Sequence, residues 1–310
     1  CVLLQSKAEK VPEAPTQEPT LQPTFDQSRL GKANRDVVYC TADDGTELLM
    51  DVYYPETNDG PWPVMMFVHG GGWSSGSKDE FYLSEFTNLG ILTVSIDYRL
   101  SPEVKFPAHI EDTKCAVRYL RANGEYYNLD PDRILAAGGS AGGHLVSLLG
   151  TTGDSGEFNT GQYLEYSSAV EAVIALSAPT DLGNWICDDS QNVESYYLYV
   201  FDSTAKCGET DEKITAASPV TYVSSEDVPF LILAGTADEV VPYQQSEILH
   251  QALLEAGVSS QLLLVEGGDH GLSVEGHPER EEEVLWTMVD FVLEQLELDE
   301  PAWVTEERNK

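Results

Sequence analysis

A single serine lies in the glycine-rich segment Gly138-Gly139-Ser140-Ala141-Gly142, which follows a short apolar run and precedes a helix-like pattern. A structural turn needs one or two glycines. The excess predicts that the serine hydroxyl projects from a sharp strand-to-helix turn with other groups packed close beside it. The spacing matches G-x-S-x-G, in which serine is the nucleophile that attacks an acyl carbon.

A serine hydroxyl needs a base to take its proton and a carboxylate to orient that base. His270 in EGGDHG and Asp238 in GTADEVVP each follow a predicted strand, as Ser140 does. Asp269 and Glu266 compete for the carboxylate role, but both lie too near His270 to come from a separate strand end. We therefore predict Ser140, Asp238 and His270 as the catalytic residues.

The oxygen of an attacked acyl group becomes negatively charged and needs hydrogen-bond donors already in place. The segment HGGGW (69–73) follows directly after an apolar run. Because glycines let backbone N–H groups approach such an oxygen closely, we predict the amides of Gly71, Gly72 and Ala141 as the oxyanion hole. Trp73 is predicted to contact the substrate.

Other interpretations of these residues are weaker. Glycine-rich turns between a strand and a helix also bind phosphate, but a P-loop lysine and the G-x-G-x-x-G spacing are both missing. His144, one helical turn beyond Ser140, is interpreted as a packing or supporting residue. His109, His250 and His277 carry no motif. No spacing of cysteine and histidine indicates a metal site, and no cofactor is predicted.

Alternating strands and helices must position these residues. Apolar runs without polar alternation predict a mostly parallel sheet covered on both faces, and Asp44-Gly45 predicts an antiparallel hairpin at its edge. In this α/β architecture, functional side chains gather at the carboxyl ends of the strands. The predicted strands are 37–42, 47–55, 63–69, 91–97, 133–139, 170–178, 229–235 and 261–266, and the predicted helices are 79–89, 108–123, 141 onward, 243–256 and 278–296.

Together HGGGW, DYRLSPE (97–103) and GGSAGG resemble the α/β-hydrolase superfamily, in its carboxylesterase branch related to hormone-sensitive lipase. The resemblance spans about residues 45–295. Segments 69–78, 106–121 and 140–153 resemble the bacterial feruloyl and acetyl-xylan esterase-like group. The resemblance implies the same three catalytic residues and the same oxyanion hole, and it implies a structural role for Asp97 and Arg99.

Relatives close to hormone-sensitive lipase carry an N-terminal helical cap, whereas the corresponding segment here is polar and rich in proline. The other lid candidate is 182–215, whose YYLY aromatics could form a pocket wall or a short core helix. An open cleft favours acetyl or feruloyl esters on carbohydrate over long-chain triglyceride. An arylformamidase or another amidohydrolase with the same triad is the alternative. A non-catalytic hydrolase-like binding module is a more remote one.

Acidic residues dominate the charge of the chain. Its 310 residues include 53 Asp and Glu against 17 Lys and Arg, which gives a formal net charge of −36. Nucleic acids and anionic lipid surfaces would be repelled, and no apolar run is long enough to span a membrane. The oligomeric state is left open. Expected partners are therefore small or polysaccharide-linked esters.

The N-terminal segment 1–30 is expected to be a disordered tether, followed by one hydrolase domain over 31–298 and a tail over 299–310. Cys1 followed by a polar tether resembles a processed bacterial lipoprotein, which would place the protein outside the cell or on its envelope; the alternative is a trimmed sequence. Cys187 and Cys207 flank one hydrophilic loop and are the expected disulfide. Cys115 is expected to be a small buried residue.

Overall fold

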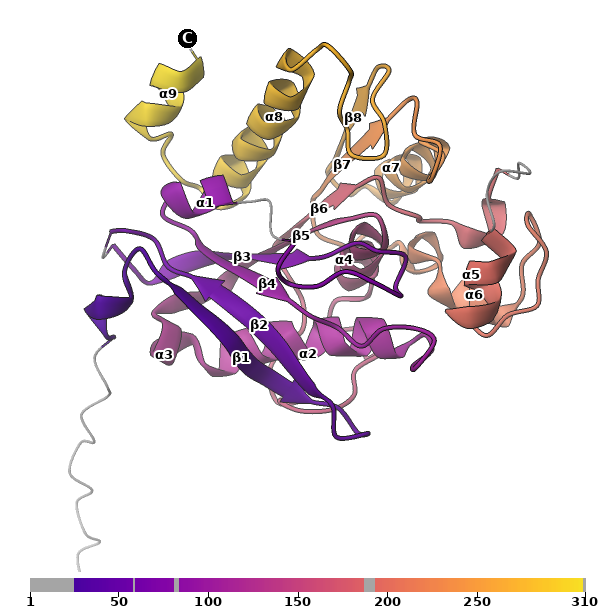
Figure 1. The fold of residues 1–310 in the computed structure, drawn as a ribbon, viewed down its shortest axis with the longest axis horizontal. Coiled ribbons are helices and arrows are strands. Elements are labelled where there is room, and N and C mark those ends of the chain that lie inside the picture. Colours follow the sequence, from indigo (N-terminus) through magenta and orange to yellow (C-terminus); the bar gives the residue numbers. More distant parts are fainter. Residues whose placement is uncertain (1–24, 58, 81–83, 187–192, 309–310) are drawn as a thin grey trace, which may run out of the picture.

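The computed structural model describes residues 25–57, 59–80, 84–186 and 193–308. Its centre is an eight-stranded sheet in the order β1-β2-β4-β3-β5-β6-β7-β8 (Figure 1). The first two pairings, β1 with β2 and β2 with β4, are antiparallel, and the others are parallel. The strands are β1 (Ala33–Thr41), β2 (Glu47–Tyr53), β3 (Trp62–Val68), β4 (Leu92–Ile96), β5 (Leu129–Gly139), β6 (Ala172–Leu176), β7 (Phe230–Gly235) and β8 (Ser260–Val265). The predicted fold class is confirmed.

Each predicted apolar run forms one of these strands. β3 and β7 are buried along their whole length, as expected for central strands with helices on both faces. Neighbouring side chains of a strand point to opposite faces. Accordingly Val64 and Met66 of β3 belong to one apolar core, and Met65 and Phe67 belong to another.

Helices cover each face of the sheet. The first core receives side chains from α2 (Ala108–Ala122), α4 (Ala141–Thr152) and α7 (Gln244–Ala256). The second receives side chains from α1 (Ser84–Asn88), α8 (Glu279–Gln295) and α9 (Ala302–Arg308). In Figure 1, α8 and α9 lie at the top and α1 lies below them. Further helices are α3 (Gly124–Tyr127), α5 (Val193–Tyr199) and α6 (Glu212–Ala217), and short 3₁₀ turns cover Gln27–Arg29, Leu182–Asn184 and Pro219–Tyr222.

Three segments differ from the sequence expectation. The helix predicted over 79–89 begins later among the described residues, since Asp79 lies in a turn and α1 starts at Ser84. The segment expected to be a tail contains α9, whose Val304 is fully buried. Phe25, placed in the tether, packs edge-on against Trp62 with ring centroids 5.1 Å apart. Residues 1–24 lie outside the described part.

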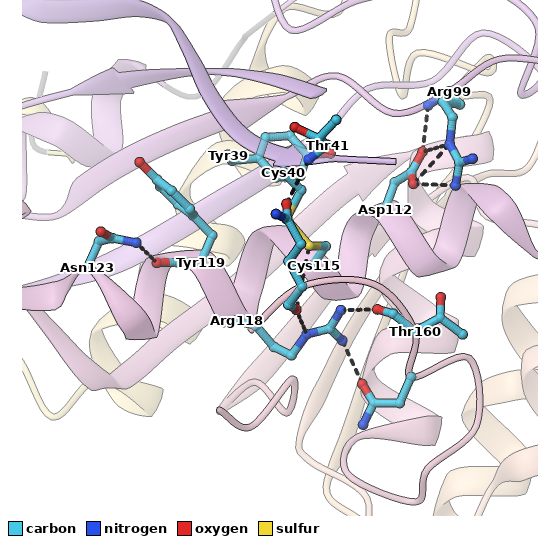
Figure 2. Close-up of a disulfide and its surroundings, with 12 residues drawn as sticks. Tyr39, Cys40, Thr41, Arg99, Asp112, Cys115, Arg118, Tyr119, Asn123 and Thr160 are labelled. Atoms are coloured by element: carbon cyan, nitrogen blue, oxygen red, sulfur yellow. Dashed lines mark hydrogen bonds and ion pairs between the residues drawn. A yellow bond between two sulfur atoms is a disulfide. The ribbon is translucent and has the colours of Figure 1, made fainter. Parts of the chain in front are cut away.

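A disulfide joins Cys40 of β1 to Cys115 of α2, with the Cα atoms 6.5 Å apart (Figure 2). Cys115 is buried, as expected, but its disulfide was not predicted, because the two cysteines lie 75 residues apart and the sequence contains no sign that β1 packs on α2. Cys207 is also disulfide-bonded. Its expected partner, Cys187, lies outside the described residues.

One turn along α2 from the disulfide, Arg118 holds the loop that follows α4 (Figure 2). Its guanidinium donates to Asn159 Oδ1 at 2.6 Å, to the Thr160 carbonyl at 2.5 Å and to the Gln162 carbonyl at 2.9 Å. Burial lowers the pKa of this guanidinium. The contacts tie α2, the disulfide and the loop into one unit on the sheet face that carries α4.

Candidate active site

Ser140 lies between β5 and α4, where the chain turns sharply. Its backbone has φ 55° and ψ −120°, and a positive φ is strained for a residue with a side chain. Its amide donates to the Leu176 carbonyl at 2.8 Å and its carbonyl accepts from the His144 amide at 2.9 Å. These two bonds hold the turn in place, so the strain is imposed by the surrounding fold.

The glycines around Ser140 are required by close packing. A Cβ on Gly142 would lie 2.0 Å from the Val68 carbonyl oxygen, and a Cβ on Gly138 would lie 2.6 Å from the Gly142 backbone. By contrast, a Cβ on Gly139 would meet nothing within 4 Å. The two glycines of G-x-S-x-G are thus fixed by the approach of β3 to α4, and the intervening glycine is not.

His270 and Asp238 pair at the carboxyl ends of β8 and β7. His270 Nδ1 lies 2.7 Å from Asp238 Oδ2, and the Asp238 side chain is fully buried. The other Asp238 oxygen accepts from the Val240 and Val241 amides at 2.7 and 2.9 Å. Asp269, the competing carboxylate, instead accepts from amides of its own loop.

Ser140 and His270 line the same pocket. Among the hydrogen bonds of the described residues, none joins the two side chains. The His270 carbonyl accepts from the Ser177 hydroxyl at 3.0 Å, which ties the histidine loop to the end of β6. Catalytic hydrogen bonds are commonly long in a free enzyme and tighten when substrate binds.

The glycines after β3 line the same pocket as His270. Gly71 and Gly72 have φ of 96° and 58°, values that favour glycine. The Gly71 carbonyl accepts from the Ser74 and Ser75 amides at 3.1 and 3.0 Å, which closes the loop into a tight turn. In the described part of the chain, the amides of Gly71, Gly72 and Ala141 donate to no backbone or side-chain acceptor. They remain available to an oxyanion.

The pocket between these groups has a volume of about 990 Å³ and a mostly apolar lining. The charged side chains on the lining are carboxylates: Glu80, Glu239 and Glu281. Its aromatic and apolar walls come from β3, the loop after it, the 3₁₀ turn Leu182–Asn184 and the residue after it, α5 and α8. They include Phe67, Trp73, Trp185, Tyr196, Leu285 and Met288.

Sequence reasoning placed Trp73 at the pocket, and it lies there, but its indole is almost fully buried. The YYLY segment (196–199) fulfils both of its alternatives. It forms helix α5, with Tyr197 buried, and Tyr196 lines the pocket. Leu285 and Met288 of α8 were missed as pocket residues, since an amphipathic helix does not show which of its apolar residues face a cavity rather than the core.

Asp97 and Arg99 lie away from the pocket lining and make structural contacts. Asp97 Oδ1 accepts from the Lys78 amide at 2.7 Å, and its carbonyl accepts from the Tyr39 hydroxyl at 2.6 Å. The Arg99 guanidinium forms a two-pronged pair with Asp112, with a shortest distance of 2.7 Å. Both residues therefore fix the loop after β4 against β1 and α2.

Within the described ranges, no cluster of three or more histidine, cysteine or acidic residues is arranged as a metal site. None of the helices described is both long enough and apolar enough to cross a bilayer.

The BD-FAE family model matches residues 50–253. The chain belongs to the BD-FAE family. This family assignment confirms the predicted resemblance to α/β-hydrolases of the feruloyl esterase-like group. Esterase LipQ of Mycobacterium tuberculosis is 34% identical over 221 residues, which cover 70% of this chain and 52% of LipQ. The BD-FAE chain spans about half the length of the curated relatives it matches.

Two solved structures with the same fold are named as esterases. A truncated carbohydrate esterase from gut microbiota superposes with a TM-score of 0.71 at 26% identity, covering 88% of this chain and 99% of the other. Esterase Est2 of Thermogutta terrifontis with bound propionate gives a TM-score of 0.72 at 26% identity, covering 88% and 98%. The α/β-hydrolase fold of the BD-FAE chain therefore extends over almost the whole of both neighbours.

Proposed function

We propose that this BD-FAE chain is a serine carboxylesterase that works through an acyl-enzyme. The observation that carries the proposal is one pocket lined by Ser140 on its strained turn and by His270, whose ring is bound to the buried Asp238. A nucleophile, a base and an orienting carboxylate are the groups that acyl transfer to serine requires.

In the first half of the reaction, His270 Nε2 takes the proton of Ser140 Oγ as the oxygen attacks the ester carbon. The carbonyl oxygen gains the negative charge and accepts hydrogen bonds from the Gly71, Gly72 and Ala141 amides. Asp238 stabilises the resulting imidazolium. His270 then gives its proton to the leaving alcohol, and the acyl group stays on Ser140.

In the second half, water takes the place of the alcohol. His270 removes a proton from the water, which attacks the acyl carbon, and the same amides stabilise the second tetrahedral intermediate. The bond to Ser140 breaks, the serine oxygen recovers its proton from His270, and a carboxylic acid leaves.

For the substrate, we propose acetyl or feruloyl esters of carbohydrate. The pocket lies at the upper end of the usual range for small-molecule sites, so it can hold an aryl acyl group and part of a sugar. Glu80, Glu239 and Glu281 on its lining favour neutral esters over anionic ones. A carbohydrate esterase and an esterase with bound propionate are among the structural neighbours, which supports short acyl groups on sugars.

For the location, we propose an oxidising compartment outside the cytoplasm. The Cys40–Cys115 disulfide supports this proposal, because such bonds persist where thiols are not kept reduced. Immunodetection of the protein in cytosolic, envelope and medium fractions of its native cells tests it. A purely cytosolic protein with free Cys40 and Cys115 thiols contradicts it.

The catalytic proposal is tested with nitrophenyl acetate, acetylated xylan, methyl ferulate and formylkynurenine as substrates. Ser140→Ala and His270→Ala are each expected to lower kcat by at least about 10³-fold, because the catalytic residues act as a unit. A fluorophosphonate probe followed by peptide mass spectrometry is expected to label Ser140. Equal rates for wild type and Ser140→Ala would overturn the proposal, and faster turnover of formylkynurenine than of every ester would make the amidohydrolase the better description.

A further inference from the structure

Three segments that build the active site meet at one buried side chain, His144. The residue lies on α4 one turn after Ser140 and is fully buried. Its Nδ1 lies 3.1 Å from Trp73 Nε1, in the loop that carries Gly71 and Gly72. Its Nε2 lies 2.7 Å from the carbonyl oxygen of Ala217, the last residue of α6.

These two contacts fix the protonation state of the ring. An indole N–H can only donate, so Nδ1 must accept, and a carbonyl oxygen can only accept, so Nε2 must carry the proton. Both contacts therefore require the same neutral tautomer. Burial lowers the pKa of His144 to about 4, although the bond to Ala217 opposes this shift, so the ring stays neutral near pH 7.

The Trp73 end of this chain of bonds is held on several sides. Its backbone has φ 57°, and its carbonyl accepts from the Ser101 amide at 2.8 Å. Its indole packs edge-on against His144 and Phe201, with centroids 5.1 and 5.2 Å away. The indole N–H bond to His144 is thus one of the contacts that hold the loop after β3 relative to the nucleophile turn.

The segment between β6 and β7, which carries α5 and α6 and is called the insertion below, packs against the same loop on its pocket side. The Tyr196 ring of α5 packs against Trp73 with centroids 6.0 Å apart, and a Cβ on Gly72 would lie 2.9 Å from that ring. Ala217, which accepts from His144, ends the other helix of the insertion. His144 therefore links the nucleophile helix, the glycine loop and the insertion.

We propose that His144 is a positioning residue for the oxyanion hole: through Trp73 it holds the Gly71 and Gly72 amides at a fixed distance from Ser140. The inference rests on the proposed function and deepens it. An acyl oxygen draws close to these amides as its charge develops, so a displaced loop weakens binding of the transition state more than binding of the ester. His144 and Trp73 act together as one unit.

The test compares His144→Phe, which keeps a ring but no nitrogen, with Trp73→Phe and the double variant. Each single change is expected to lower kcat about 10- to 50-fold with KM changed less than about threefold, and the double variant should be no worse than the poorer single variant. His144→Asn retains an acceptor oxygen near the Nδ1 position and should recover most of the loss.

Thr151→Val serves as the matched control, because it removes a buried hydroxyl bond within the same helix, to the Ser147 carbonyl, without touching the loop. It should lower Tm but leave kcat unchanged. A kcat within twofold of wild type for His144→Phe, or independent, multiplying losses in the double variant, would overturn the proposal.

Hydrogen–deuterium exchange separates failure of this inference from failure of the esterase proposal. The Ser74 and Ser75 amides bond to Gly71, so their exchange reports on the loop without any substrate. Exchange of a peptide covering 73–76 should quicken in His144→Phe and not in Thr151→Val. If exchange quickens in His144→Phe and not in Thr151→Val, but the wild type hydrolyses no ester, the esterase proposal alone is rejected. Unchanged exchange in His144→Phe rejects the positioning role, whatever the activity.

Discussion

Asp238 binds His270 with one carboxylate oxygen and two backbone amides with the other. Oδ2 lies 2.7 Å from His270 Nδ1, and Oδ1 accepts from Val240 and Val241. The carboxylate is therefore fixed by main chain before it meets the histidine. The Asp238 side chain is fully buried and so shielded from competing water, whereas 30% of the His270 side chain is exposed.

Replacing this carboxylate by an amide tests its role in orienting the base. Asp238→Asn is expected to lower kcat by about 10⁴-fold, because an amide NH₂ at the Oδ2 position favours the wrong histidine tautomer. Circular dichroism should show an unchanged fold. Asp269→Asn is the control, since the Asp269 side chain accepts from amides of its own loop and is not paired with His270 among the described contacts. An Asp238→Asn enzyme within tenfold of wild type would contradict the assignment.

The G-x-S-x-G turn offers a matched pair of glycine substitutions. Gly142→Ala would place a Cβ 2.0 Å from the Val68 carbonyl oxygen, whereas Gly139→Ala would meet nothing within 4 Å. Gly142→Ala should lower the free energy of unfolding by about 3 kcal/mol or more, and Gly139→Ala by less than about 1 kcal/mol. Urea denaturation measures both. Equal losses would mean that the close approach of β3 to α4 does not exist.

The Cys40–Cys115 bond closes a loop with a sequence separation of 75 residues. Removing it as Cys40→Ser with Cys115→Ser should lower the free energy of unfolding by roughly 3–4 kcal/mol, because the unfolded chain gains freedom. Any further loss of stability when reductant is added to this double variant then reports on the disulfide of Cys207 alone. A double variant as stable as wild type would show that the crosslink constrains little.

Acidification should destabilise the protein through His144. Burial lowers the pKa of this residue to about 4 from 6.5, so between these values the unfolded chain binds a proton that the folded chain does not. The stability it contributes is therefore present above pH 6.5 and lost as the pH falls toward 4, on the order of 3 kcal/mol in total. His109, with its pKa lowered by burial to about 3, acts in the same direction.

Urea unfolding of wild type, His144→Asn and Thr151→Val at pH 7, 6 and 5 measures this dependence. The slope of stability against pH should be shallower in His144→Asn and unchanged in Thr151→Val, whose substituted residue does not titrate. Parallel slopes for wild type and His144→Asn would mean that His144 takes up no proton on unfolding in this pH range.

The sheet was predictable because its strands are continuous apolar runs. WPVMMFV of β3 and FLILAG of β7 have no polar face, so each must lie in the interior of a covered sheet. Once the strand ends were located, Ser140, Asp238 and His270 followed from what comes next in the sequence. They lie at the same end of the sheet because the strands before them, β5, β7 and β8, all run in the same direction.

Contacts between distant segments were not predictable. Cys40 and Cys115 meet because β1 lies over α2, and no local pattern encodes that packing. The short α9 has one buried apolar residue, Val304, which is too little for a periodic signal. His144 showed only a position on a helix, because its two partners come from a loop and an insertion elsewhere in the chain.

The insertion that carries α5 lies against the glycine loop through Tyr196, and the same tyrosine forms part of the pocket wall. If the chain is the esterase proposed above, substrate choice and reaction rate depend on shared residues at this contact. Grafting the corresponding insertion from a relative would exchange the preferred ester only together with the rate at which it is cleaved. A change of Tyr196 that alters the pocket wall would therefore also alter the packing against Gly72.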